Sequence, residues 1–463
     1  MIKIIKSIIV WGALFSLFVV LLAECGGNST SPIVWLSNSS STSECEDESQ
    51  IESTLSCFSF PEETDNLILY SFWFHDDALQ RAAELFREKY PDVRVELQSM
   101  DVEEFADRLR TELPAGRGPD VFFDCGFALP DIYKTMSTGI FTDLAPYMAN
   151  DEEYRSEEYY DTVLKGGVMF GKQFIIPLTF GLNTLLTSEE LLAQNGISAD
   201  SFLTWEGFLE ACTVFHEKKP GSRLIDRSME RCYIPQIFKG IGFRMIDYDH
   251  DAVSFDEIRF KQMLDLCWMY CYPDQPDDLP YGGGWTYLKT GDCLFLDETE
   301  SSTMVLMNSC AGVRDVEQTP ILLHVPNEDG GVTAEIKNFA AIPEASKNKL
   351  NAWRFIKVLL SPEIQGGREG QAFYPVMTPG FSVRRESLRQ LLTETRKMFA
   401  CTDEDIKQAL SLTERVTDSV MLPHIVMRYV TEYMIPFVTG QNGFIYEEQL
   451  DKLVNTLKLY KDE

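Results

Sequence analysis

The hydrophobic and polar positions between residues 66 and 127 predict that strands and helices alternate along this stretch. Apolar, β-rich runs indicate strands, whereas apolar residues spaced three and four positions apart indicate helices that bury one face. Pro91 ends the first helical pattern, since the residue before a proline is pushed out of helical geometry. The predicted β-α-β-α-β unit has strands at residues 67–74, 93–97 and 121–123 and helices at residues 78–89 and 102–113.

Such a unit forms a parallel sheet covered by helices, because crossovers between parallel strands are right-handed. Ligands of open α/β sheets bind outside the carboxyl ends of the strands. Those ends carry Trp73 and Phe74 on the first predicted strand and Phe123 and Asp124 on the third. Rings that stack on C–H faces and a carboxylate that accepts hydroxyl hydrogen bonds suit a sugar. We therefore expect these four residues to contact a ligand.

Two later stretches predict further features of the site. Residues 171–186 predict a strand, a kink and a second strand, with Pro177 and Gly181 as the breakers. Three glycines precede Trp285, and this pattern favours a ring at a loop tip in a binding cleft over a buried tryptophan.

The acidic residues 247–251 invite a calcium site, but the sequence argues against one. An EF-hand loop needs glycine at its sixth position and glutamate at its twelfth, where this chain has Ala252 and Ile258. The five histidines show no metal-ligand spacing, and no nucleophile-elbow, zinc-protease, P-loop or dinucleotide motif is present. We predict a solvated turn here, no metal, no cofactor and no enzymatic activity.

The N-terminus has the pattern of a secretory signal. Lys3 and Lys6 precede an apolar run at residues 8–23. The following Cys25-Gly26-Gly27 resembles the lipobox of bacterial lipoproteins, which implies cleavage before Cys25 and its acylation, although Glu24 stands where that pattern has a small residue. An uncleaved signal anchor is the alternative, but the run is slightly shorter than the ~20 residues that span a bilayer. Residues 26–65 are polar and predict a flexible linker.

Composition narrows the class of protein. A chain of 463 residues predicts more than one domain, and a hydrophobic fraction of 44% excludes global disorder. The net charge of −31 argues against a nucleic-acid partner, because phosphate contacts need a basic surface. Export permits disulfides, and Cys45 with Cys57 can close a loop in the linker. We expect the other cysteines to be buried; Cys267 and Cys271 share a helix face, which favours core packing over a metal pair.

The order of segments resembles the carbohydrate-type extracellular solute-binding proteins of ABC importers, relatives of maltose-binding protein. The resemblance covers essentially everything after residue 65, and residues 342–365 contain its most specific match. That match is the run from Ser346 to Lys349 followed by the run from Ala352 to Gln365. The other stretches that carry the resemblance are residues 69–74, 90–93, 118–121, 171–184 and 204–208.

The resemblance implies a two-lobed α/β fold of the type II periplasmic-binding-protein kind, each lobe a mostly parallel sheet flanked by helices. A hinge motion then closes a cleft over the ligand, with chain crossings near residues 178–183, 322–342 and 375–383. The expected division is a signal at residues 1–25, a linker at 26–65, lobe 1 at 66–178 plus 322–375, and lobe 2 at 179–321 plus 376–463.

The implied function is capture of a sugar or oligosaccharide and its delivery to an ABC permease by a monomeric protein. The implied location is the outer face of the bacterial cytoplasmic membrane, with Cys25 as the lipid anchor. Two alternatives stay open: a secreted carbohydrate-active enzyme, and a receptor or scaffold that keeps the fold without transport. The predicted ligand-binding residues are Trp73, Phe74, Phe123, Asp124, Phe180, Asn183, Tyr281, Trp285 and Tyr374.

Overall fold

The computed structural model describes residues 64–72, 76–225, 244–270, 284–297, 302–377, 379–421, 423–438 and 443–463. The predicted signal segment, Cys25 and the linker up to residue 63 lie outside this part of the chain. None of the helices in the described ranges is both long enough and apolar enough to cross a membrane.

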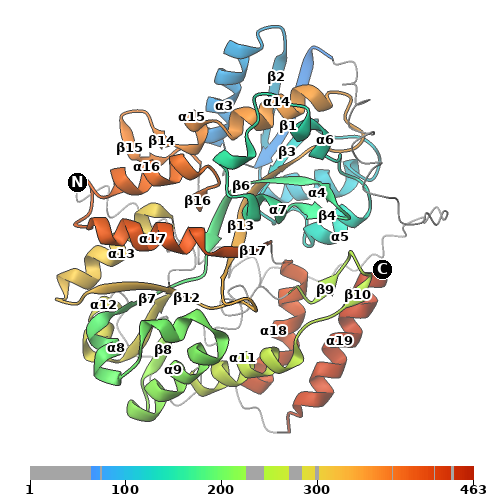
Figure 1. The fold of residues 1–463 in the computed structure, drawn as a ribbon. Helices are drawn as coiled ribbons and strands as arrows, with labels where there is room; N and C mark the ends of the chain where they lie inside the picture. The colour runs from blue at the N-terminus through green and yellow to red at the C-terminus, as the bar shows by residue number, and fades with distance from the viewer. Residues whose placement is uncertain are drawn as a thin grey trace, which may run out of the picture. The chain divides into compact units, whose positions relative to one another are not determined.

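The β-α-β-α-β unit predicted from the sequence is confirmed at the start of the described chain (Figure 1). β1 lies between β2 and β3 and runs parallel to both. Asp101 begins α4 by accepting the backbone N–H of Glu104, which satisfies one of the unpaired donors of the first helical turn. The bounds are β1 Asn66–Phe72, α3 Asp76–Lys89, β2 Arg94–Met100, α4 Val102–Glu112 and β3 Val121–Asp124.

This unit is one half of a seven-stranded sheet with the order β16-β6-β13-β3-β1-β2, in which β17 pairs with β13. The pairs β1/β2, β1/β3 and β13/β17 are parallel, whereas β13/β3, β13/β6 and β16/β6 are antiparallel. The prediction of a mostly parallel sheet is wrong for the part of the sheet that follows β3 in the strand order. There β13 arrives from another sheet and runs antiparallel to β3. The added strands are β6 Ile175–Leu182, β13 Val332–Ala341, β16 Phe381–Ser382 and β17 Val416–Val420.

The second sheet has four strands in the order β12-β7-β11-β8. β7 runs antiparallel to both β12 and β11, and only β11 and β8 are parallel. This sheet is therefore not mostly parallel either, because β7 arrives from the first sheet and its neighbour β12 returns toward it. The bounds are β7 Thr184–Ser188, β8 Arg223–Ile225, β11 Cys293–Asp297 and β12 Pro320–His324.

Two connections join the sheets where the sequence predicts crossings. β6 continues into β7 with only Asn183 between them, and residues 325–331 connect β12 to β13. Asn327 holds the second connection, since its Oδ1 accepts the backbone N–H groups of Asp329 (3.1 Å) and Gly331 (2.9 Å). Short connections of this kind concentrate dihedral changes in a few residues, as a hinge requires.

The predicted kink at Pro177 and Gly181 is wrong. Both residues lie inside β6, which is buried along its whole length. Pro177 pairs with Phe339 of β13 at a point where the register shifts, and a bulge is one of the few places where a strand tolerates the missing N–H of proline. The break between the two predicted strands falls at Asn183 instead.

The C-terminal segment contributes two short strands to the first sheet. The resemblance implies that residues 376–463 belong to lobe 2, whereas β16 pairs with β6 and β17 pairs with β13. Backbone pairing with the crossing strands holds both short strands in the first sheet. The lobe boundaries themselves stay a prediction.

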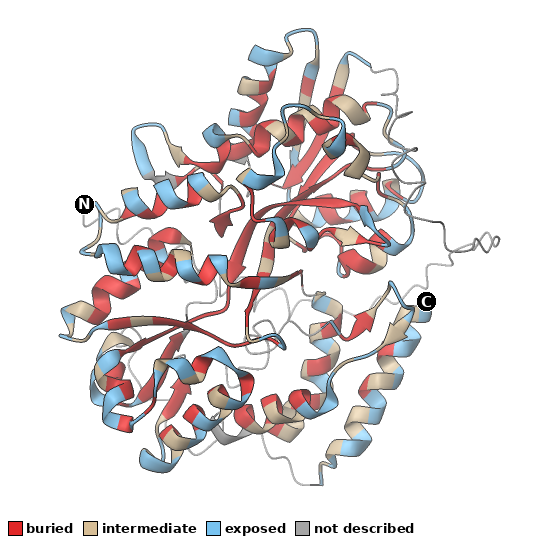
Figure 2. Ribbon diagram, in the orientation of Figure 1, coloured by how far each residue is buried: buried red, intermediate tan, exposed pale blue. Residues whose placement is uncertain are grey.

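The remaining helices bury apolar stripes against the strands, and most buried residues in Figure 2 lie on the strands and on inward helix faces. Trp205 and Trp353 are among these core residues. Small hairpins are formed by β4 Val168–Met169 with β5 Lys172–Gln173, β9 Ile246–Asp247 with β10 Ala252–Val253, and β14 Gly367–Arg368 with β15 Gln371–Pro375. The other helices are α5 Ile132–Ser137, α6 Ala145–Ala149, η3 Ser156–Glu158, α7 Asp161–Lys165, α8 Glu189–Asn195, η4 Ala199–Leu203, α9 Trp205–Lys218, α11 Glu257–Tyr270, α12 Gly284–Thr290, α13 Thr303–Asp315, α14 Lys349–Leu359, α15 Pro362–Gln365, α16 Arg385–Thr395, α17 Asp403–Glu414, α18 His424–Val438 and α19 Tyr446–Asp462.

Candidate functional site

Asp124 is the last residue of β3 and is completely buried. Its Oδ1 accepts the backbone N–H groups of Cys125 (2.8 Å) and Phe127 (3.2 Å), which fixes the turn after the strand. Its Oδ2 is also buried and has no hydrogen-bond partner among the described residues. Burial raises the pKa of Asp124 to about 6, although the backbone amides oppose this shift. Near neutral pH such a carboxyl group can either donate or accept a hydrogen bond.

β13, which returns from the second sheet, carries two charged side chains beside this turn. Glu335 and Lys337 lie on one face of the strand, because residues two apart share a face, and their ion pair is 2.9 Å long. Their side chains are only 19% and 14% exposed. Phe339 of the same strand pairs with Asp124. Burial and the Asp124 charge raise the pKa of Cys125, and the nearby charge of Lys337 opposes that shift.

The start of α18 lies against the turn that follows β3. Gly126 has a φ of 89°, and a Cβ at this position would meet Met421 Sδ at 3.3 Å and His424 Nε2 at 3.8 Å. Phe127 stacks on the His424 ring with a centroid separation of 5.7 Å, and it also touches Phe72 at the end of β1. The glycine therefore allows the turn to approach α18 closely.

These elements bring hydrogen-bonding groups and a ring together at the edge where β1 and β3 end. Phe127, Glu335 and Lys337 are partly buried, and His424 is exposed. A carboxylate accepts hydrogen bonds, an ammonium group donates them, and an aromatic face can stack on an apolar face of a ligand. The group can therefore bind a polyhydroxylated molecule without reacting with it.

Two predicted ligand contacts lie in the core instead. Phe123 is 1% exposed and packs against Phe355 of α14, and Phe180 is completely buried between Tyr160 and Phe381. The prediction fails for both rings because neither has an open face on which a sugar can stack. Phe123 lies within β3 and Phe180 within β6, so both belong to the packed interior of the first sheet.

Asn183 lies in a connection between the two sheets, whereas Trp285 lies in a helix. Asn183 is the single residue between β6 and β7 and is 6% exposed. Trp285 does not lie at a loop tip, since it belongs to the first turn of α12. A Cβ on Gly312 of α13 would meet the Trp285 ring at 2.2 Å, so the indole packs directly on that glycine. The absence of a side chain at Gly312 explains why a partly buried tryptophan fits between the two helices.

The remaining predicted contacts lie outside what the structure describes. Trp73, Phe74 and Tyr281 fall in its gaps, as does the proposed anchor Cys25. The backbone of Tyr374 lies in β15, but its side chain is outside the described part. Their roles stay predictions.

Sequence reasoning missed Phe127, Glu335, Lys337 and His424. A signal for the charged pair was present, because opposite charges two residues apart interrupt an otherwise buried strand. No comparable signal was available for His424, which follows β17 more than 290 residues after Phe127. Only the pairing of β17 with β13 brings α18 to this corner.

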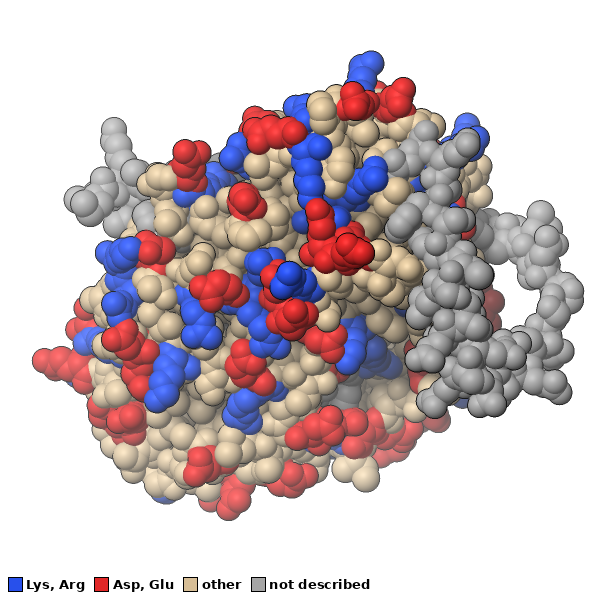
Figure 3. All heavy atoms as spheres, turned by 45° about the horizontal axis from the view of Figure 1, so that its top comes forward, with Lys and Arg blue, Asp and Glu red and all other residues tan. Residues whose placement is uncertain are grey.

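Among the described residues, neither the distribution of surface charge nor a cluster of metal-binding side chains indicates another site. On the face shown in Figure 3, acidic and basic side chains are interspersed rather than gathered by sign. No group of three histidine, cysteine or acidic residues within the described ranges is arranged to hold a metal ion. The turn at residues 247–251 is a hairpin between β9 and β10, in which the exposed His250 pairs with Asp247 at 2.8 Å.

Comparisons with known proteins agree with the resemblance. Residues 75–230 match the family model described as bacterial extracellular solute-binding protein. Three solved structures share the fold. They are the sugar-binding protein MalE from Xanthomonas citri (15% identity, 86% of this chain and 97% of that chain, TM-score 0.61), a periplasmic oligogalacturonide binding protein from Yersinia enterocolitica (16%, 86% and 99%, 0.59) and the cyclic alpha-maltosyl-1,6-maltose binding protein from Arthrobacter globiformis (16%, 87% and 100%, 0.56).

At these identities the structural likeness establishes the fold, and it confirms the predicted fold class. The family and the three structures are described as binding proteins rather than enzymes, in agreement with the prediction that the chain is not an enzyme. Residues 75–230 therefore match the model of the bacterial extracellular solute-binding proteins, and over most of its length the chain has the type II periplasmic-binding-protein fold.

Proposed function

We propose that this protein captures a sugar or oligosaccharide at the edge of the first sheet where β1 and β3 end. The family match and the fold support a solute-binding role. The sugar-binding descriptions of three proteins with this fold favour a carbohydrate over other solutes. Delivery to the permease of an ABC importer follows from the same resemblance.

The observation that carries the proposal is the convergence of Phe127, Glu335, Lys337 and His424 beside the buried carboxyl of Asp124. These residues come from the turn after β3, from β13 and from α18, and the crossing strand β13 supplies the charged pair. A ligand bound here lies next to the connections between the sheets. Its contacts can therefore favour a closed arrangement, as ligand-driven hinge closure requires.

The chemistry of the corner suits hydroxyl groups better than a single charged group. Glu335 and Lys337 already neutralise each other, so neither presents a net charge to an incoming ion. Each still has hydrogen-bonding capacity left, since a carboxylate has about four acceptor positions and an ammonium group has three donors. The stacked pair of Phe127 and His424 offers a flat surface for the apolar face of a sugar ring.

The wider role adds elements that lie outside the described residues. We propose that Cys25 becomes the acylated N-terminus and holds the protein on the outer face of the bacterial cytoplasmic membrane. The proposed partners are the carbohydrate and the permease subunits, and the protein is a monomer in this account. Mass spectrometry of membrane-extracted protein tests the anchor: an intact Met1 end would reject cleavage before Cys25.

A thermal-shift screen of the purified protein against neutral and acidic oligosaccharides tests the proposed function. A ligand present at 100 times its dissociation constant stabilises the folded protein by about 2.7 kcal/mol, so a true ligand gives a clear increase in Tm. The proposal expects at least one neutral sugar to raise the Tm and to be recovered unchanged. Recovery of a cleaved sugar would favour the enzyme alternative, and a screen with no hit would favour the receptor or scaffold.

A further inference from the structure

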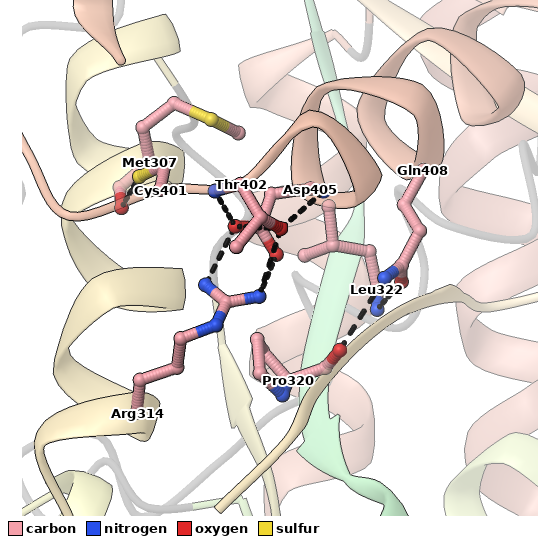
Figure 4. A network of polar contacts seen from close by, with 8 residues as sticks. All are labelled: Met307, Arg314, Pro320, Leu322, Cys401, Thr402, Asp405 and Gln408. Atoms are coloured by element: carbon pink, nitrogen blue, oxygen red, sulfur yellow. Dashed lines mark hydrogen bonds and ion pairs between the residues drawn. The ribbon is translucent and has the colours of Figure 1, made fainter. Parts of the chain in front are cut away.

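The N-terminus of α17 is anchored on α13 by a polar network (Figure 4). Two nitrogens of Arg314 donate to the two carboxylate oxygens of Asp405, each at 2.6 Å. Thr402 caps α17 and forms a capping box with Asp405. Gln408, one turn further along α17, bonds to the backbone of the edge strand β12. α17 is therefore held against the second sheet before the chain returns to the first sheet in β17.

Cys401 lies directly before this cap and reaches the same face of α13. Its Sγ is 2.8 Å from the carbonyl oxygen of Met307 (Figure 4). Cys310 lies three residues further along α13, and helical side chains lean over the turn that precedes them. We therefore expect the thiol of Cys310 to lie over the turn that contains Met307. The electrostatic influence of both cysteines on Arg314 also places them in one neighbourhood.

We propose that Cys310 and Cys401 form a redox site that closes to a disulfide between α13 and the start of α17. Neither residue forms a disulfide in this structure. The oxidant is a disulfide of a small thiol or of a thiol oxidoreductase outside the cytoplasm. The Cys401 thiolate attacks this disulfide and releases one thiol, and Cys310 then attacks the mixed disulfide and releases the second. In total, two protein thiols and one disulfide give one protein disulfide and two small thiols.

The surroundings of Cys401 predict when this bond forms. Burial, with a further contribution from the Asp405 charge, raises the pKa of the Cys401 thiol to about 11. Only about one thiol in ten thousand is then ionised at pH 7, and the thiolate is the reactive form. In the folded protein the bond should therefore close slowly at neutral pH and about tenfold faster for each added pH unit. It should close readily during folding, before α17 has covered the pair.

A disulfide at this position encloses a long segment of the chain. The linked residues are 91 positions apart (401 − 310), and a loop of this length restricts the unfolded chain strongly. The bond would hold the second-sheet end of α17, while the other end of this helix leads into β17 beside the crossing strand β13. This inference takes from the proposed function only the expectation that the protein lies outside the cytoplasm, where thiols can be oxidised. The bond itself can be tested without any ligand.

The test is to refold the full chain in a buffer of oxidised and reduced glutathione, block free thiols, and map peptides without reduction. We expect one linked pair that contains Cys310 and Cys401. We also expect a Tm roughly 3–8 °C above that of the fully reduced protein. The Cys401→Ser variant should lose both the link and the redox-dependent Tm shift.

Cys310 is completely buried, so Cys310→Ala is compared with Cys212→Ala, which truncates an equally buried thiol on α9. The link should disappear in Cys310→Ala and persist in Cys212→Ala. Alkylation of both Cys310 and Cys401 in the oxidised wild-type protein would overturn the proposal. A stable glutathione adduct on Cys401 beside a free Cys310, or a link from either cysteine to another partner, would overturn it as well.

Discussion

Two completely buried carboxylates, Asp405 and Asp124, have opposite surroundings. Asp405 uses both oxygens: Arg314 binds them in a fork, and the backbone N–H and hydroxyl of Thr402 add further bonds. Asp124 has backbone donors on Oδ1 alone, and its Oδ2 has no hydrogen-bond partner among the described residues. Burial raises the pKa of Asp124 to about 6.

We interpret this difference as one between a structural carboxylate, Asp405, and a carboxylate at the proposed ligand site, Asp124. A buried polar group that makes all its hydrogen bonds rigidifies the fold. A buried polar group that lacks some of its hydrogen bonds lowers the stability, and such groups are found mainly at functional sites. Asp405 joins helices α13 and α17. Asp124 ends β3, where open α/β sheets bind their ligands. Three substitutions test this distinction, in order of the expected effect.

The largest effect is expected for Asp405→Ala. The substitution leaves the guanidinium of Arg314 without its partner and removes half of the capping box of α17. Loss of one member of a buried pair destabilises by about 3–5 kcal/mol, and the partial exposure of Arg314 places the expected loss near the lower end. Urea unfolding measures it. The control is Asp403→Ala on the same helix, whose side chain is 90% exposed and should cost about 0.5 kcal/mol or less.

Asp124→Asn should make the protein more stable at neutral pH. The folded pKa of Asp124 lies above the unfolded value of about 3.9, so the stability contributed by this carboxyl is present below about pH 4 and is lost as the pH rises through 6. The amide avoids the buried charge, and the expected gain at pH 7.5 is about 2–3 kcal/mol. Urea unfolding at pH 7.5 and 5.0 should show this gain falling to roughly half at the lower pH. A variant that is less stable than the wild type at pH 7.5 would show that the charge of Asp124 is satisfied.

Tyr248→Phe should remove the hydrogen bond to one carboxylate oxygen of Asp131, so that Asp131 resembles Asp124. The Tyr248 hydroxyl donates to Asp131 Oδ2 at 2.6 Å, while Asp131 Oδ1 caps α5. Burial already raises the pKa of Asp131, and removal of this donor should raise it further. The expected loss is about 1–2 kcal/mol in urea unfolding. Tyr433→Phe, which removes a hydroxyl that bonds to neutral Thr456, should cost less; equal losses would mean that the charge of Asp131 does not matter.

The sequence predicted those parts of the molecule that local pattern determines. Periodicity located β1 to β3 with their two helices. Local pattern could not show that Pro177 is tolerated at a register shift, because the compensating irregularity involves β13, which is distant in sequence. Trp285 was placed in a loop because the glycines precede it, while the residue that accommodates its ring is Gly312 on another helix.

The candidate site was harder to predict than the fold. Aromatic residues at strand ends were chosen as contacts, but Phe123 and Phe180 pack inward because both faces of their strands are covered. Apart from Phe127, the residues that lie beside Asp124 come from β13 and α18, which follow much later in the chain. The long-range pairing of β13 and β17 decides which side chains meet there. A single sequence gives no direct information about that pairing.

The most direct test of the sugar site is a calorimetric titration of wild type, Lys337→Met and Lys349→Met with the sugar that gives the largest thermal shift. Lys349 is the matched control, because it also forms a partly buried ion pair with a glutamate, at the start of α14 and outside the proposed site. The account predicts that Lys337→Met weakens binding about 10- to 100-fold, as expected when a charged hydrogen-bond donor is lost, and that Lys349→Met binds like the wild type. Wild-type affinity in Lys337→Met would contradict the proposed site.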